Sequence, residues 1–187
     1  MKTLKVLILP FFLLTVSFRS VSPIGYAADI DKSQIKWTGY AEAGGYAPTG
    51  TVKLKMGSIF FNSEQLISGK IIIDMPTIST GNQEMEKHLK GKDFFDVAVY
   101  SEATFALSSM KNNIASGILT IKGISQKVAV PVMITKTNEG MVLKATLKVN
   151  RTKFNIKYNS KSYFQDLGNY AIKNEFDLDI SLACHPN

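Results

Sequence analysis

The chain has 187 residues, a formal net charge of +7 and one cysteine, Cys184. Its lysines are interleaved with acidic residues, which argues against the continuous basic stripe of a nucleic-acid-binding protein. A single cysteine cannot form an internal disulfide, so burial must hold the fold together, with Cys184 as a buried small hydrophobe or a free thiol.

An export signal is predicted at the N-terminus. Two lysines precede an apolar run over residues 6–16, and small residues follow just before residue 29. The run is shorter than the roughly 20 residues of a membrane-spanning helix, and Pro10 interrupts it, so no stable membrane anchor is expected. We therefore predict a signal peptide over residues 1–28 and one domain over residues 29–187, in the periplasm or secreted.

Most of this domain alternates apolar and polar residues, a pattern that is typical of amphipathic strands. The clearest segments are residues 51–56, 143–150 and 176–182, and Met56 belongs to the apolar face of the first. In a further strand Pro131 lacks a backbone donor, which predicts a sheet edge or a bulge there. The other predicted strands cover residues 35–41, 67–75, 104–108, 115–122 and 128–135.

One stretch differs from these strands. Good helix formers occupy residues 82–89, with Asn82 near the start and Gly91 past the end, which predicts a short helix. About eight antiparallel strands, each with one apolar face, fit a sandwich or a closed barrel, and closure removes exposed edges. We predict an all-β fold with a barrel favoured. Such a barrel can be filled by side chains or hold a small ligand, and periodicity does not choose between these.

Catalytic motifs are missing from the sequence. There is no Gly-x-Ser-x-Gly turn and no glycine loop for phosphate, and only His88 and His185 could act as a histidine base. Adjacent residues on a strand point to opposite faces, so Cys184 and His185 make a poor pair of metal ligands. We expect no enzyme, no cofactor and no metal site.

Three blocks follow one another in a recognisable order. Residues 88–105 begin HLKGKDFFDV, residues 117–128 are GILTIKGISQKV, and residues 151–156 are RTKFNI. Together they resemble the signature of the YceI-like lipid/polyisoprenoid-binding family, and the match covers essentially all of residues 29–187. Three positions depart from the family pattern, namely Ser101, Lys153 and Asn155. Asn155 replaces a glycine, and asparagine tolerates a positive φ, so we expect the turn to be kept.

The resemblance implies a lipocalin-like antiparallel β-barrel of about eight strands with a short helical insertion. It also implies a periplasmic carrier that holds a polyisoprenoid or an isoprenoid quinone in an apolar channel. Each buried methylene contributes roughly 0.8 kcal/mol, so an apolar channel can bind such a lipid without catalytic groups. The candidate ligand-binding residues are Trp37, Leu54, Ile71, Ile73, His88, Leu89, Phe94, Phe95, Phe105, Leu107, Leu119 and Phe154.

These candidates are not equal. The apolar ones would also be buried in a filled barrel, whereas Phe94 and Phe95 follow the helix, where the chain could cover the barrel mouth. His88 could contact a head group, and Arg151 could pair with Asp93 or Asp96 or meet the ligand.

Two other hypotheses stay open. The first is an extracytoplasmic stress-response or protein-interaction module with a filled barrel and no ligand. The second is an enzyme that acts on a lipid. The sequence also leaves open whether the chain forms a homodimer.

Overall fold

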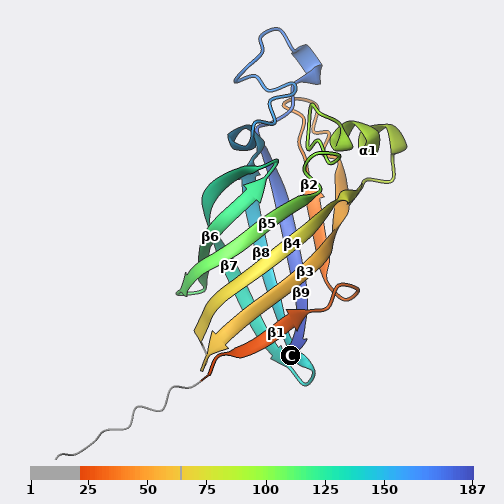
Figure 1. Ribbon diagram of the computed structural model, residues 1–187. Helices are drawn as coiled ribbons and strands as arrows, with labels where there is room; N and C mark the ends of the chain where they lie inside the picture. The colour runs from red at the N-terminus through yellow and green to blue at the C-terminus, as the bar shows by residue number, and fades with distance from the viewer. Residues whose placement is uncertain (1–21, 64) are drawn as a thin grey trace, which may run out of the picture.

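The computed structural model describes residues 22–63 and 65–187 (Figure 1), so most of the predicted signal peptide lies outside the described residues. The described chain forms nine strands, one α-helix, α1 (Gln83–Lys90), and two short 3-10 helices, η1 (Arg151–Phe154) and η2 (Gly168–Tyr170). No helix in this part of the chain is long and apolar enough to cross a lipid bilayer. The strands are β1 (Ile24–Ala28), β2 (Gln34–Thr38), β3 (Thr49–Asn62), β4 (Gln65–Ser79), β5 (Glu102–Lys111), β6 (Ile114–Ile121), β7 (Ile124–Thr137), β8 (Gly140–Asn150) and β9 (Glu175–Pro186).

The strands form one closed antiparallel sheet. From β3 to β9 each strand pairs with the next along the chain, and β1 and β2 both pair with β3 and β9 to close it. Tyr26 of β1 lies opposite Ile59 and Pro186, whereas Trp37 of β2 lies opposite Gly50 and Leu178. Because β1 and β2 fill successive lengths of the same gap, nine strands make a barrel eight strands round. The predicted barrel of about eight strands with one short helix is confirmed.

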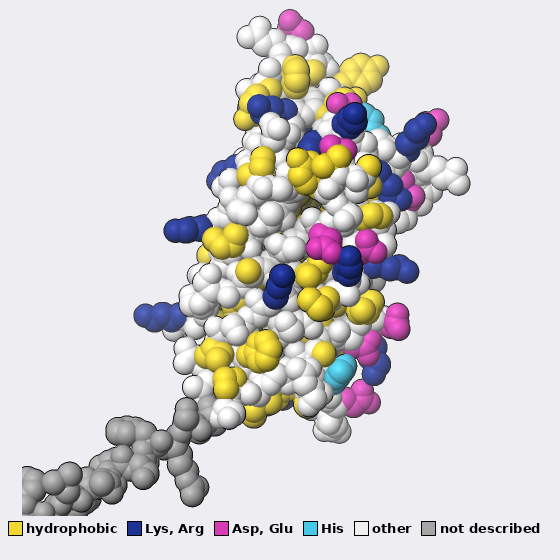
Figure 2. All heavy atoms as spheres, viewed as in Figure 1, with side chains coloured by type: hydrophobic (Ala, Val, Ile, Leu, Met, Phe, Trp, Pro, Cys, Tyr) yellow, Lys and Arg dark blue, Asp and Glu magenta, His cyan; other side chains and the backbone are white. Residues whose placement is uncertain are grey.

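The long connections gather at one end of the barrel and most of the short turns at the other (Figure 1). We call the end that carries α1 and residues 151–174 the mouth, and the end with the chain's C-terminus the far end. The outer wall between them carries basic and acidic side chains mixed together on the face shown in Figure 2. The mixing agrees with the interleaved charges of the sequence.

Strand β1 closes the barrel at the far end. Residues 24–27 pair with β3, and residues 26–28 pair with β9. The ring of Tyr26 meets Phe61 edge to face, with centroids 5.6 Å apart. A Cβ at Gly57 would lie 2.6 Å from the Cβ of Ala28, so β3 needs a glycine there for β1 to approach. The predicted boundary before residue 29 thus coincides with the end of a paired strand.

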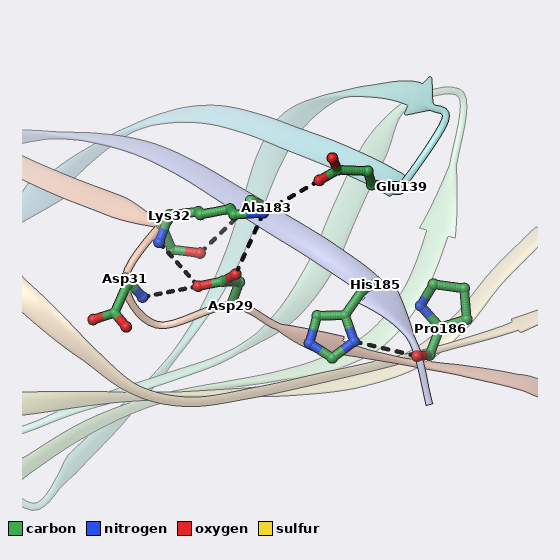
Figure 3. A network of polar contacts seen from close by, with 8 residues as sticks. Asp29, Asp31, Lys32, Glu139, Ala183, His185 and Pro186 are labelled. Atoms are coloured by element: carbon green, nitrogen blue, oxygen red, sulfur yellow. Dashed lines mark hydrogen bonds and ion pairs between the residues drawn. The ribbon is translucent and has the colours of Figure 1, made fainter.

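The turn after β1 is fastened to neighbouring strands (Figure 3). The carboxylate of Asp29 accepts hydrogen bonds of 3.0 Å from the backbone N–H groups of Asp31 and Lys32. The backbone N–H of Asp29 donates to the Ala183 carbonyl at 2.8 Å, and the Lys32 ammonium lies 3.2 Å from a Glu139 carboxylate oxygen. The hydrogen bond from Lys32 is the main reason that the pKa of Asp29 is lowered. The start of the barrel is therefore joined to β9 and to the turn between β7 and β8.

One strand departs from its predicted pattern. The prediction that Met56 faces inward is wrong, because a bulge between Leu54 and Met56 shifts the register of β3 against β4. Met56 is 46% exposed, and Gly57 takes the inward position. A bulge adds one residue and so reverses the faces of all that follow.

Other local predictions are confirmed. Pro131 is the last residue of β7 that pairs with β6, and pairing with β8 begins only at Val132, so Pro131 has a partner strand on one side alone, as at the predicted edge. The side chain of Asn82 caps α1 by accepting from the Met85 N–H at 3.0 Å. Asn155 ends η1 with φ of 59°, the left-handed conformation expected at this turn.

Candidate ligand-binding cavities

Four cavities follow one another along the barrel axis. The mouth cavity has a volume of about 380 Å³, the upper cavity about 100 Å³, the lower cavity about 110 Å³ and the open far-end cavity about 950 Å³. Ile73, Leu119 and Leu178 line both the upper and the lower cavity, and Leu66 lines both the lower and the far-end cavity. The shared walls make these spaces a series rather than separate sites.

The lower cavity is wholly apolar. Every residue of its wall is an aliphatic residue, phenylalanine or glycine, as expected from strands whose alternate side chains point inward. These residues are Ile35, Ile59, Leu66, Gly69, Ile71, Ile73, Phe105, Leu107, Ala115, Leu119, Val130, Val132, Leu143, Ala145, Leu147, Leu178, Ile180 and Leu182. Such a wall offers no hydrogen bond from a side chain, so it suits a hydrocarbon and no polar group.

Aromatic rings surround the mouth cavity. His88 of α1 meets the rings of Phe94 and Tyr158 edge to face, with centroids 5.1 Å and 4.5 Å apart. The rings of Phe94 and Tyr158 are themselves 5.4 Å apart. The other residues of this wall are Trp37, Gly39, Tyr40, Ala41, Tyr46, Pro48, Glu84, Met85, Leu89 and Ile172. Flat rings with polar tips can hold a group that is apolar on its faces and polar at its edge.

Arg151 brings a buried positive charge to the wall of the upper cavity. Its side chain is 4% exposed and donates three hydrogen bonds, to the carbonyls of Lys173 at 2.9 Å, Ile156 at 3.0 Å and Ile172 at 2.9 Å. Burial lowers the pKa of Arg151 to about 10, so the guanidinium stays charged at neutral pH. It pairs with neither Asp93 nor Asp96 among the ion pairs of the described residues. Arg151 therefore joins η1 to the segment before β9 and shapes the mouth.

Tyr40 is fixed in the wall that the mouth and upper cavities share. Its hydroxyl donates to a carboxylate oxygen of Asp177 at 2.6 Å, and the Lys148 ammonium donates to the other oxygen at 2.9 Å. The hydrogen bond from Tyr40 is the largest cause of the lowered pKa of Asp177. The hydrogen bond to Asp177 thus fixes the Tyr40 ring in the cavity wall.

Trp37 lies beside Tyr40 at the junction of the mouth and upper cavities. Its ring packs against Gly50, where a Cβ would lie 2.6 Å from the ring. Its indole N–H is the one buried side-chain nitrogen or oxygen in the described chain without a hydrogen-bond partner.

The structure places the predicted ligand-binding residues as follows. Trp37, Ile73, Leu89, Phe94, Phe95 and Leu119 line the upper cavity, Ile71, Phe105 and Leu107 line the lower cavity, and His88 lines the mouth cavity. The remaining two, Leu54 and Phe154, are 3% and 2% exposed and belong to the hydrophobic core, but they line none of the four cavities. For these two, packing explains the burial.

Sequence reasoning missed several residues of the mouth and upper cavities. Tyr158 and Ile172 belong to irregular segments, which have no periodicity that tells an inward from an outward side chain. Tyr40 falls within the predicted strand over residues 35–41, but β2 ends at Thr38, so alternation does not give the direction of its side chain. Phe176 and Leu178 lie on a strand whose alternation was clear, so the apolar face of residues 176–182 was the signal that could have found them.

The chain was compared with known proteins. A model of the YceI-like domain matches residues 26–184. A UPF0312 protein from Pseudomonas savastanoi is 33% identical over 98 residues, which are 49% of this chain and 49% of that protein. A UPF0312 protein from Yersinia pestis is 31% identical over 85 residues, 42% of this chain and 44% of that protein. The chain thus spans about half the length of the curated relatives it matches.

Solved structures share the fold. BcnA from Burkholderia cenocepacia has a TM-score of 0.70 and 23% identity over 83% of this chain and 98% of its own. A polyisoprenoid binding domain from Saccharophagus degradans has a TM-score of 0.67 and 12% identity over 87% of this chain and 98% of its own. A YceI protein from Campylobacter jejuni has a TM-score of 0.53 and 16% identity over 100% of this chain and 99% of its own. With the family model matching nearly the whole described barrel, the chain belongs to the family of YceI-like domains.

Proposed function

We propose that the protein binds and carries a long isoprenoid lipid, either a polyisoprenoid or an isoprenoid quinone. The observation that carries this proposal is the series of cavities, apolar inside the barrel and aromatic at the mouth. The tail would occupy the upper and lower cavities, and the head group would lie at the mouth near His88 and Tyr158. The similar domain from Saccharophagus degradans is described as polyisoprenoid binding, which supports the same ligand class.

The size of the cavities limits how a tail enters. An apolar cavity of about 150 Å³ holds one benzene molecule, so spaces of about 100 Å³ and 110 Å³ hold roughly one isoprene unit each. A longer tail therefore requires the side chains between them to move. Ile73, Leu119 and Leu178 line both spaces and are the residues that must rotate. Each methylene that then replaces empty space contributes roughly 0.8 kcal/mol.

The alternative of a filled barrel predicts no internal cavity. The upper and lower cavities count against it, because close-packed interiors contain few voids larger than a water molecule.

Native mass spectrometry of the protein purified from bacteria tests the lipid proposal. We expect an added mass that organic solvent removes and that is identified as an isoprenoid lipid, and we expect the emptied protein to take up a prenylated quinone. A protein that is pure, folded and free of lipid, and that takes up neither prenol nor prenylated quinone, would contradict it.

We further propose that the protein is exported and works in the periplasm or outside the cell. The predicted signal peptide supports this location. Fractionation of expressing bacteria by osmotic shock is the test, with export expected to depend on the apolar run over residues 6–16. Retention of the folded protein in the cytoplasmic fraction would contradict export.

A further inference from the structure

We infer that residues 156–174 form a docking surface that places the barrel mouth on an anionic lipid membrane. This inference rests on the proposed function, because a carrier of an apolar lipid must meet a membrane to load or release it. The segment projects beyond the barrel at the top of Figure 1, on the same side as α1. We call residues 156–174 the docking loop.

The docking loop exposes three aromatic side chains. Tyr163 is 48% exposed, Phe164 49% and Tyr170 80%, and Tyr46 from the neighbouring loop at the mouth is 61% exposed. Exposed aromatic rings cost free energy in water, but tyrosine and tryptophan are enriched at the interface between water and membrane, where one end of the ring is apolar and the other is wet. Met133, which is 67% exposed, lies apart from this group on β7. The concentration of rings at the mouth therefore needs an explanation.

The charges of the docking loop favour an anionic membrane over a neutral one. It contains three lysines, Lys157, Lys161 and Lys173, against one acidic residue, Asp166. None of these lysines takes part in an ion pair within the described residues. The ammonium of Lys157 lies 4.7 Å from the centroid of the Tyr163 ring. A cation and an apolar ring are thus presented together, as in peptides and helices that bind anionic lipid.

The base of the docking loop is held firmly enough to present these side chains. The Ser160 hydroxyl is fully buried and donates to the Asn174 side-chain oxygen at 2.6 Å. The Ser160 carbonyl accepts hydrogen bonds of 3.0 Å from the N–H groups of Tyr163 and Phe164. Both exposed rings therefore stand on a turn that is anchored in the protein.

The docking loop also forms part of the mouth cavity. Tyr158 and Ile172, near its two ends, line that cavity, and the Arg151 guanidinium binds the Ile172 carbonyl at 2.9 Å. Insertion of the exposed rings into a membrane interface would place the cavity entrance against the lipid. A tail could then pass from the membrane to the barrel with little exposure to water.

Vesicle flotation tests the inference, using vesicles of phosphatidylcholine alone and of phosphatidylcholine with an equal part of phosphatidylglycerol. We expect the full protein to bind the anionic vesicles more tightly. The variant Lys157→Gln/Lys161→Gln should lose about fivefold in binding per lysine on anionic vesicles and nothing on neutral ones. The variant Tyr163→Ser/Phe164→Ser should lose on the order of tenfold on anionic vesicles. Met133→Ser, the matched control on the barrel wall, should bind as the unchanged protein does.

Three outcomes would overturn the inference. These are no binding of the unchanged protein to anionic vesicles, equal binding by the docking-loop variants, or self-association through the docking loop in sedimentation without vesicle binding. Unchanged thermal unfolding shows that the docking-loop variants still fold. Native mass spectrometry of the same variants separates membrane docking from lipid carriage. A protein that holds lipid in the barrel but does not bind vesicles would contradict the docking proposal and leave the carrier proposal standing. A protein that binds vesicles but holds no lipid would contradict the carrier proposal and leave the docking proposal standing.

Discussion

The two ends of the barrel differ in the residues that line them. At the mouth the wall is aromatic and is built largely by long irregular segments, whereas the far-end cavity mixes apolar residues with Asn62, Ser63, Gln65, Asn112, Asn113 and Lys136. Asn112 and Asn113 both have positive φ, as the short turn between β5 and β6 requires. The short turns leave polar atoms around a wet opening, and the long segments fold over the other end to form an apolar entrance. Under the proposed function, the mouth is therefore the more favourable entrance for a lipid tail.

Removal of β1, which closes the far end, should give the largest change in stability. A chain that begins at Asp29 lacks a strand that pairs with four residues of β3 and three of β9. At roughly 1 kcal/mol per hydrogen bond, together with the contact of Tyr26 with Phe61, we expect a loss of about 4 kcal/mol in the free energy of unfolding. Urea denaturation measures it, with a chain that begins at Ser22 as the control. Equal midpoints would show that β1 contributes nothing and would favour the boundary before Asp29.

Arg151→Lys tests how the mouth is held. A lysine ammonium cannot reproduce the planar guanidinium group that donates to three carbonyls, so we expect two of these buried carbonyl oxygens to lose their hydrogen-bond donor. We expect a loss of about 2 kcal/mol in the free energy of unfolding and faster proteolysis within residues 156–174. Lys153→Gln, an exposed site on the same 3-10 helix, is the control and should change stability by less than about 0.5 kcal/mol. If both variants unfold alike, Arg151 does not organise the mouth.

Leu119→Phe tests whether a tail passes from the mouth toward the far end. The larger ring fills space between the upper and lower cavities, so a long prenol should bind about tenfold more weakly, a change of about 1.4 kcal/mol. A short prenol that occupies only the mouth and upper cavities should bind as before. Leu54→Phe is the control, because Leu54 is buried but lines no cavity, and it should destabilise the fold without changing the preferred chain length. A preference unchanged by Leu119→Phe would refute the path.

The smallest effect concerns Cys184 near the far end. Its side chain is 5% exposed, and burial raises the pKa of the thiol to about 11 from 9.0. The unfolded state releases this proton first, so the contribution of Cys184 to the free energy of unfolding is constant below pH 9 and falls between pH 9 and pH 11. At pH 8 we expect a thiol reagent to label Cys184 at least roughly 100-fold more slowly than an exposed cysteine, and quickly in urea. Fast labelling of the folded protein would mean that the far end opens.

Local chemistry explains why much of the fold was predictable. The alternation of residues 143–150 and 176–182 predicted β8 and β9, and Asn82 and Gly91 predicted the limits of α1. Met56 was missed because a bulge arises from pairing with another strand, and the sequence of one strand does not contain the register of its partner.

The amino-acid sequence by itself predicted the strands from β2 to β9, the short helix, the turn at Asn155 and the family, because each depends on neighbouring residues or on short ordered motifs. It did not predict β1, which lies within the predicted signal peptide. Tertiary structure alone decided that β1 and β2 share one gap, that Arg151 binds carbonyls, and that cavities exist. It also separated Leu54, which only packs, from Leu119, which lines two cavities. The physical reason is that alternation shows which side chains point inward. The space left between those side chains depends on how all the strands of the barrel close around it.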